Sequence, residues 1–177
     1  MKKIIAKLLQ EGKLCSIFTD NAEKFAVGYI LAADGEFVLY GAVGPYGRDD
    51  GLCCLRIESI FKIETDTEYI KDMELLFRYR GEVRRPKIAG DDVLDAVLTE
   101  ALHGKKLCTV ELCGSGCDDV IGYLTEIAGE ELGFAMLDEH GNSDGKTIFE
   151  RGSISSIKFE SEDEEKIAAL FRLKSAK

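Results

Sequence analysis

The sequence predicts a mainly β protein made of two copies of one small, strongly bent five-stranded barrel, each copy flanked by helices. The chain matches itself at an offset of 94 positions, with 14 identities between residues 27–78 and 121–172, where unrelated segments would give roughly three. Each copy holds five short apolar segments separated by turn residues. We therefore expect a first domain at residues 1–78, a linker at 79–90 and a second domain at 91–177.

Each copy is expected to begin with an amphipathic helix and to continue as five strands. Apolar residues recur at helical spacing near the start of each copy, namely Ile4, Ile5, Leu8 and Leu9, then Val97, Leu98, Ala101 and Leu102 after the N-cap candidates Asp91 and Asp92. The expected strands cover residues 13–19, 25–33, 36–43, 52–58 and 60–64 in the first copy, and 106–112, 119–127, 130–137, 146–151 and 154–159 in the second.

A second helix is expected to close each copy. Thr67 and Ser161 occupy equivalent N-cap positions, and Ser161 with Glu164 fits a capping box. The apolar face of these helices consists of Met73, Leu76 and Phe77 in the first copy and Ile167, Leu170 and Phe171 in the second. The acidic residues between Glu160 and Glu165 are interpreted as a solvated helix start, which the helix dipole favours.

Gly28 and Gly122 hold matching positions in the long second strand of each copy. A strand that must curl to close a five-stranded barrel needs a residue without Cβ where it bends, so we expect both glycines to supply curvature. The alternative is that they leave room for a side chain of a partner or ligand.

This order of elements resembles the Sm-like family, which includes the bacterial RNA chaperone Hfq. The resemblance is carried by the glycine in strand two, the Asp34-Gly35 turn into strand three, a loop of variable length, and the run from Ile148 to Ile157. It implies an SH3-like barrel in each copy and edge-to-edge pairing between barrels. RNA-binding members use a polar residue after strand two and a basic element before strand five, which correspond here to Asp34 and Arg56. The second copy departs from this pattern with Ala128 and Glu150.

The basic residues that stand out lie in and beside the linker. Residues 78–90 carry five basic groups and one acidic group, whereas the whole chain has a net charge of −10. Arginines with a stacking aromatic suit single-stranded RNA, which makes candidates of Arg78, Tyr79, Arg80, Arg84, Arg85 and Lys87. The alternative is a basic hinge that neutralises the acidic surfaces of the two copies, and the net charge disfavours RNA in general.

Composition argues for a cytoplasmic protein. No segment approaches the ~18 consecutive apolar residues needed to cross a bilayer, so no membrane partner is expected. Cys15 and Cys108 are equivalent residues within apolar strands, and the adjacent Cys53 and Cys54 point to opposite faces of one strand. We interpret these thiols as reduced and structural.

The sequence contains no recognisable reaction motif. Cys113 and Cys117 could take a soft metal with His103 or His140, but a zinc site normally needs a second cysteine pair, so a turn with incidental thiols is favoured. The loop 138–145 resembles a calcium loop but fails both EF-hand registers. We therefore expect no catalytic residues, no metal and no cofactor.

These observations predict a non-catalytic tandem Sm-like protein that serves as a structural or protein-interaction module. Its expected partner is another copy of itself, or another protein, bound through the strand edges of the barrels. The alternative is an RNA-binding Sm-like protein that uses the basic linker and the first copy.

Overall fold

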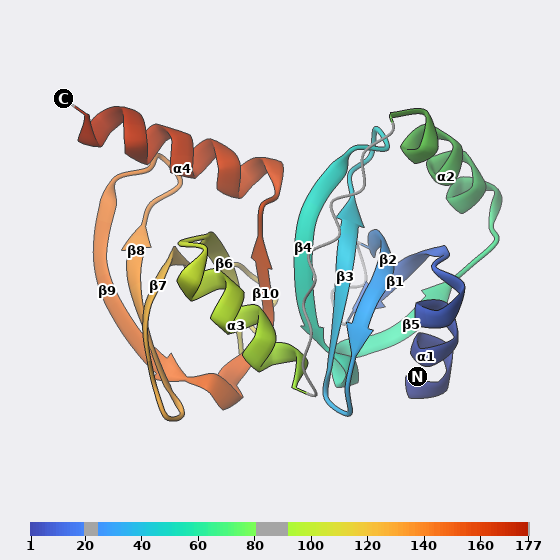
Figure 1. Cartoon of the computed structure of the whole chain (residues 1–177), viewed down its shortest axis with the longest axis horizontal. Helices are drawn as coiled ribbons and strands as arrows, with labels where there is room; N and C mark the ends of the chain where they lie inside the picture. The colour runs from blue at the N-terminus through green and yellow to red at the C-terminus, as the bar shows by residue number, and fades with distance from the viewer. Residues whose placement is uncertain (20–24, 81–91, 177) are drawn as a thin grey trace. The chain divides into compact units, whose positions relative to one another are not determined.

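A computed structural model describes residues 1–19, 25–80 and 92–176. The chain is mainly β, with 44% of residues in strands and 34% in helices. It divides into two compact units, Met1–Leu94 and Asp95–Lys177 (Figure 1). Among the described helices, none is long and apolar enough to cross a membrane.

The first unit is an antiparallel sheet with strand order β5-β1-β2-β3-β4 and two helices. Its elements are α1 (Lys2–Glu11), β1 (Leu14–Thr19), β2 (Phe25–Ala33), β3 (Phe37–Val43), β4 (Asp49–Arg56), a 3-10 turn (Ile57–Ser59), β5 (Ile60–Glu64) and α2 (Glu68–Arg80). α2 extends to Arg80, so Arg78, Tyr79 and Arg80 are helical. Arg84, Arg85 and Lys87 lie outside the described residues.

The two faces of this sheet hold two apolar cores because side chains alternate along β2. Ile30 packs in one cluster with Ile5 and Leu8 of α1. Val27 and Tyr29 pack in the other, which also contains Ile70 and Met73 of α2. The period-two pattern of β2 thus places one helix against each face.

The second unit has the same order of elements and the strand order β10-β6-β7-β8-β9. Its elements are α3 (Val93–His103), β6 (Leu107–Leu112), β7 (Val120–Ala128), β8 (Glu131–Leu137), β9 (Ser143–Glu150), a 3-10 turn (Arg151–Ser153), β10 (Ile154–Phe159) and α4 (Glu162–Ser175). The boundary between the units lies within α3, so its first two residues, Val93 and Leu94, belong to the first unit.

The repeat extends to the pairing register. Cys15 lies opposite Gly28, and Cys108 lies opposite Gly122. The ladder between the second and third strands is interrupted by a bulge after Ile30 in one unit and after Leu124, its equivalent, in the other. The same backbone irregularity therefore recurs 94 positions later.

The two strand-two glycines allow a close approach of backbone. A Cβ at Gly28 would lie 2.5 Å from the Gly41 carbonyl oxygen, and one at Gly122 would lie 2.5 Å from the Ala135 carbonyl oxygen. Neither glycine has a positive φ. Space against the third strand is thus a sufficient reason for glycine at both positions, whereas the sequence suggested curvature.

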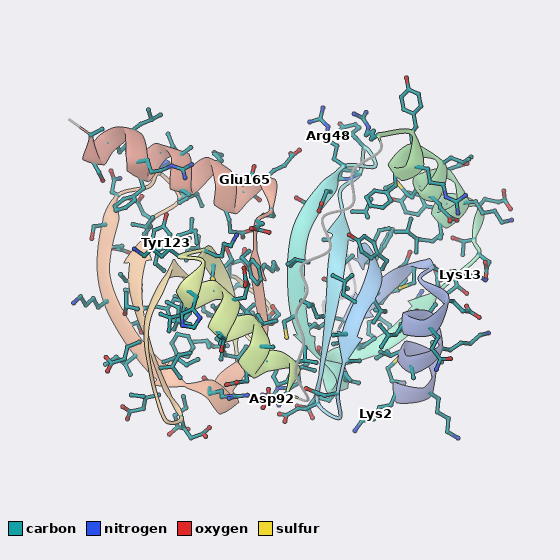
Figure 2. All side chains as sticks on the ribbon, viewed as in Figure 1. Lys2, Lys13, Arg48, Asp92, Tyr123 and Glu165 are labelled. Atoms are coloured by element: carbon teal, nitrogen blue, oxygen red, sulfur yellow. The ribbon has the colours of Figure 1, made fainter. Side chains whose placement is uncertain are left out.

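The turn between the third and fourth strands packs on the closing helix of each unit. Gly47 has φ +68°, and a Cβ there would lie 2.6 Å from Leu76 Cβ of α2. Its equivalent Gly141 has φ +73°, and a Cβ there would lie 2.7 Å from the backbone nitrogen of Phe171 in α4. The Phe171 ring stands 6.0 Å from the ring of Tyr123, which is labelled in Figure 2.

The expected helices and strands are present, with two kinds of difference in the sheets. β4 and β9 begin three residues earlier than expected because Val43 pairs with Asp49 and Leu137 with Ser143, which shortens both turns. Within the described residues no ladder joins β4 to β5 or β9 to β10, so each unit is an open sheet. The Sm-like barrel stays a prediction.

Candidate functional site

Asp34 stabilises its own turn at the end of β2. Its Oδ1 accepts hydrogen bonds from the backbone nitrogens of Glu36 at 2.6 Å and Phe37 at 2.7 Å. Partial burial by itself raises the pKa of this carboxyl, but hydrogen bonds from the amides of Phe37, Glu36 and Val93 outweigh it and lower the pKa below its usual value. The carboxylate that the sequence offered for RNA contact is therefore engaged within the first unit.

Arg56, the second predicted RNA contact of the first copy, is also engaged. Phe37 and Arg56 are cross-strand partners, and the guanidinium lies 4.6 Å from the centre of the Phe37 ring. Arg56 also forms an ion pair with Glu36 and lies 3.9 Å from Glu58. Asp34 and Arg56 thus both contact Glu36 and Phe37, and both stabilise the β2–β3 turn.

Of the basic and aromatic residues that the sequence offered for RNA contact in and beside the linker, the structure describes Arg78, Tyr79 and Arg80. These three residues form the last turn of α2. Arg78 pairs with Glu74 one helical turn earlier, at 2.5 Å. Tyr79 is 88% exposed. Arginines in the last turn of a helix are favoured by the helix dipole, so their placement has a local physical reason.

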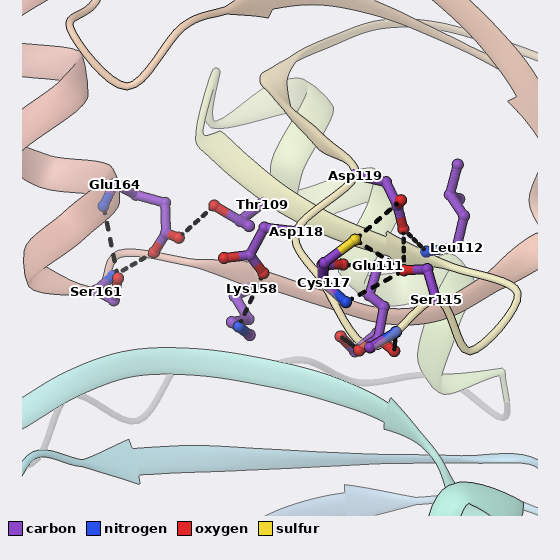
Figure 3. Close-up of polar contacts among 12 residues, drawn as sticks. Thr109, Glu111, Leu112, Ser115, Cys117, Asp118, Asp119, Lys158, Ser161 and Glu164 are labelled. Carbon is purple, nitrogen blue, oxygen red and sulfur yellow. Dashed lines mark hydrogen bonds and ion pairs between the residues drawn. The ribbon is translucent and has the colours of Figure 1, made fainter. Parts of the chain in front are cut away.

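In the second unit, two carboxylates and a serine shape the cysteine loop between β6 and β7 (Figure 3). Asp119 Oδ2 accepts hydrogen bonds from Leu112 N at 2.7 Å and from the Ser115 hydroxyl at 2.6 Å. Glu111 accepts one from Gly116 N at 3.0 Å. The hydrogen bond from Ser115, with those from Leu112 and Cys117, lowers the pKa of Asp119.

The thiols of this loop are exposed. Cys117 Sγ lies 3.4 Å from Ser115 Oγ and 3.5 Å from Asp119 Oδ1 (Figure 3). Among the residues that the structure describes, no three potential metal ligands lie close enough together to hold an ion. The polar groups of the loop serve its own conformation.

The acidic run between Glu160 and Glu165 is not wholly solvated, which corrects the interpretation made from the sequence, because Glu164 is buried. Its side chain is buried, and Oε1 accepts a hydrogen bond from the Thr109 hydroxyl at 2.6 Å while Oε2 accepts one from Ser161 N at 3.0 Å (Figure 3). The predicted capping box of Ser161 and Glu164 is confirmed. In the first unit the equivalent position is Ile70, which is buried among apolar residues.

A cluster of four aromatic rings, three of them exposed and that of Phe18 half-buried, lies at the β5 side of the first unit. The Phe18 ring is 5.0 Å from Phe25 and 6.2 Å from Phe61, and Phe25 is 5.6 Å from Tyr69. Phe25, Phe61 and Tyr69 are 44%, 53% and 45% exposed. Lys62 Nζ lies 3.7 Å from the centre of the Phe18 ring. We call Phe18, Phe25, Phe61 and Tyr69 the β5 patch.

The second unit folds in the same order without these rings. The repeat and the strand registers match the four patch positions with polar residues, namely Glu111, Asp119, Ser155 and Asp163. Three of these take part in the hydrogen bonds that shape or anchor the cysteine loop. The fold therefore does not require aromatic residues at these positions. For this reason the β5 patch is a stronger candidate for a functional surface than the β2–β3 turn at Asp34 and Arg56 or the cysteine loop.

Sequence reasoning missed the β5 patch. The signal was present, because sliding the chain on itself aligns these aromatic residues with acidic residues and serine.

Comparison with protein-family models, curated proteins and solved structures finds no match to the chain.

Proposed function

We propose that the chain is a non-catalytic, tandem Sm-like protein of the cytoplasm that assembles with other protein chains, its own copies first, through sheet edges. The observation that carries the proposal is the β5 patch, because exposed aromatic side chains gather beside the last strand of a sheet. A strand at a sheet edge presents unpaired N–H and C=O groups, which readily pair with another chain. Exposed apolar groups next to such an edge stabilise the contact by leaving water.

Two edges are candidates. Within the described residues β5 pairs only with β1, and β9 pairs only with β8. β9 also carries an exposed apolar residue, Ile148, which is 71% exposed. The helix-then-five-strands order of both units supports the Sm-like resemblance, which implies edge pairing.

The RNA-binding alternative has less support. The side chains of Asp34 and Arg56 are engaged in contacts within the first unit. RNA binding stays a prediction that depends mainly on Arg84, Arg85 and Lys87.

Hydrogen exchange at two protein concentrations tests the proposal. Edge amides exchange quickly while they face water and slowly once they pair with another strand. We expect peptides that cover β5 or β9 to gain protection as the concentration of the chain rises, and we expect Phe61→Ser to weaken the gain at β5. Identical exchange of both strands at low and high concentration would contradict self-assembly through these edges.

A further inference from the structure

The charges beside the β5 patch cancel locally, although the chain as a whole is acidic. Lys62 pairs with Glu64 at 3.0 Å, and Lys71 pairs with Glu68 at 2.6 Å. An apolar centre with mixed charges at its margin is the usual composition of a protein–protein contact surface. These two ion pairs, formed by described residues beside the patch, leave no net positive charge of their own for a polyanion.

The sequence of charges on β5 is complementary to itself. Lys62 and Glu64 flank Ile63 on an edge strand. If two copies of β5 pair antiparallel with Ile63 opposite Ile63, residues at equal distances on either side of it face each other, so Lys62 of one chain lies opposite Glu64 of the other. A contact about a twofold axis uses the same surface on both chains, and it requires this kind of self-complementarity.

We propose that the partner of the β5 patch is the β5 patch of a second copy of this chain. The two β5 strands pair antiparallel about a twofold axis at Ile63, and the aromatic rings of both chains form one apolar cluster beside the joined strands. This inference rests on the proposed function and names its first partner. The contact closes on itself, so this edge joins two chains and no more.

A charge-reversal experiment tests the register directly. Lys62→Glu gives a chain with two acidic residues at the edge, and Glu64→Lys gives a chain with two basic residues there. Each variant alone places like charges opposite each other twice, so we expect its dimer dissociation constant to rise at least about tenfold, as measured by sedimentation equilibrium. An equimolar mixture of the two variants restores both attractive pairs, and its dissociation constant should return to near the wild-type value.

A matched pair of variants controls for net charge. Lys7 and Glu11 form an exposed i,i+4 pair on α1, with Lys7 Nζ 3.7 Å from Glu11 Oε1. Lys7→Glu and Glu11→Lys change the charge of the chain by the same amounts, and we expect no effect on the dissociation constant. Circular dichroism and thermal melting identify any variant that fails to fold.

The outcomes separate this inference from the proposed function. If the wild type assembles but the Lys62 and Glu64 variants change nothing, or if their mixture does not recover, the twofold contact at β5 is wrong. If, in that case, Ile148→Ser makes the chain monomeric, the chains assemble through the β9 edge instead, and the proposed function stands. A wild type that is monomeric at every concentration overturns the twofold contact and self-assembly together.

Discussion

Gly28 and Gly122 give the sharpest test of how the two units are packed. A methyl carbon at Gly28 would lie 2.5 Å from the Gly41 carbonyl oxygen and 2.7 Å from Tyr40 Cδ2, and one at Gly122 would lie 2.5 Å from the Ala135 carbonyl oxygen. Ordinary carbon–oxygen contacts begin at about 3.3 Å, so the second and third strands would have to separate by about 0.8 Å. The two carbonyl oxygens belong to the backbone and cannot rotate away, whereas Tyr40 Cδ2 belongs to a side chain.

We expect Gly28→Val and Gly122→Val each to lower the free energy of unfolding of its own unit by about 1–3 kcal/mol, the usual cost of overfilling a packed core. At roughly 4–8 °C per kcal/mol for a unit of this size, the melting temperature falls by about 4–24 °C. Calorimetry measures the transition, and hydrogen exchange of β7 and β8 peptides assigns the loss from Gly122→Val to the second unit.

Alanine variants provide the matched comparison. Gly122→Ala meets the same carbonyl oxygen, whereas a Cβ at Gly133 of β8 has its nearest neighbours at 3.5 Å and 3.6 Å, which is ordinary contact. We expect Gly122→Ala to destabilise and Gly133→Ala to change stability by no more than about 0.5 kcal/mol. Equal melting temperatures for both variants would refute the close-approach argument.

Three further predictions follow from the polar groups and thiols. The lowered pKa values of Asp34 and Asp119 mean that their contribution to stability is present above about pH 4, the ordinary carboxyl pKa, and is lost as pH falls through the lower folded-state values. Urea unfolding at pH 7 and pH 3 should therefore show a smaller loss of stability on acidification for Asp34→Asn than for the wild type; equal losses would contradict this role. Glu164→Ala should cost about 1–3 kcal/mol in urea unfolding because it leaves the buried Thr109 hydroxyl without its acceptor and removes the capping box, and a loss below about 0.5 kcal/mol would show that neither contact matters. Burial raises the pKa of Cys15 to about 12 and that of Cys108 further, so a thiol reagent at pH 8 should label only the exposed Cys113 and Cys117 quickly, and fast labelling of the other cysteines in the folded chain would contradict the packing.

The order of elements was predictable from sequence because it depends on local patterns. Alternating apolar residues mark the strands, and Ser161 with Glu164 marks the start of α4. The early start of β4 was not predictable in this way, because Asp49 becomes a strand residue only through its pairing with Val43.

The candidate site could not be predicted from the sequence in this way, because it depends on contacts between residues that are far apart in the chain. Phe18, Phe25, Phe61 and Tyr69 come from four elements, and only the pairing of β1 with β2 and β5 brings the first three together. Glu164 resembles its acidic neighbours in the sequence, but Thr109 lies 55 residues away and supplies the hydrogen bond that accompanies its burial. Asp34 and Arg56 match an RNA-binding pattern by residue type, while Glu36 and Phe37 engage them in the fold.

The mass of the wild-type particle tests the central claim, which is assembly of this protein through its sheet edges. One chain has a mass of 19.5 kDa, so two chains joined through the β5 patch have a mass of 2 × 19.5 = 39.0 kDa. Light scattering across a range of protein concentrations should give that mass, or a higher multiple if β9 also pairs, and Phe61→Ser should shift it toward the mass of one chain. A constant mass of one chain at every concentration would contradict the account.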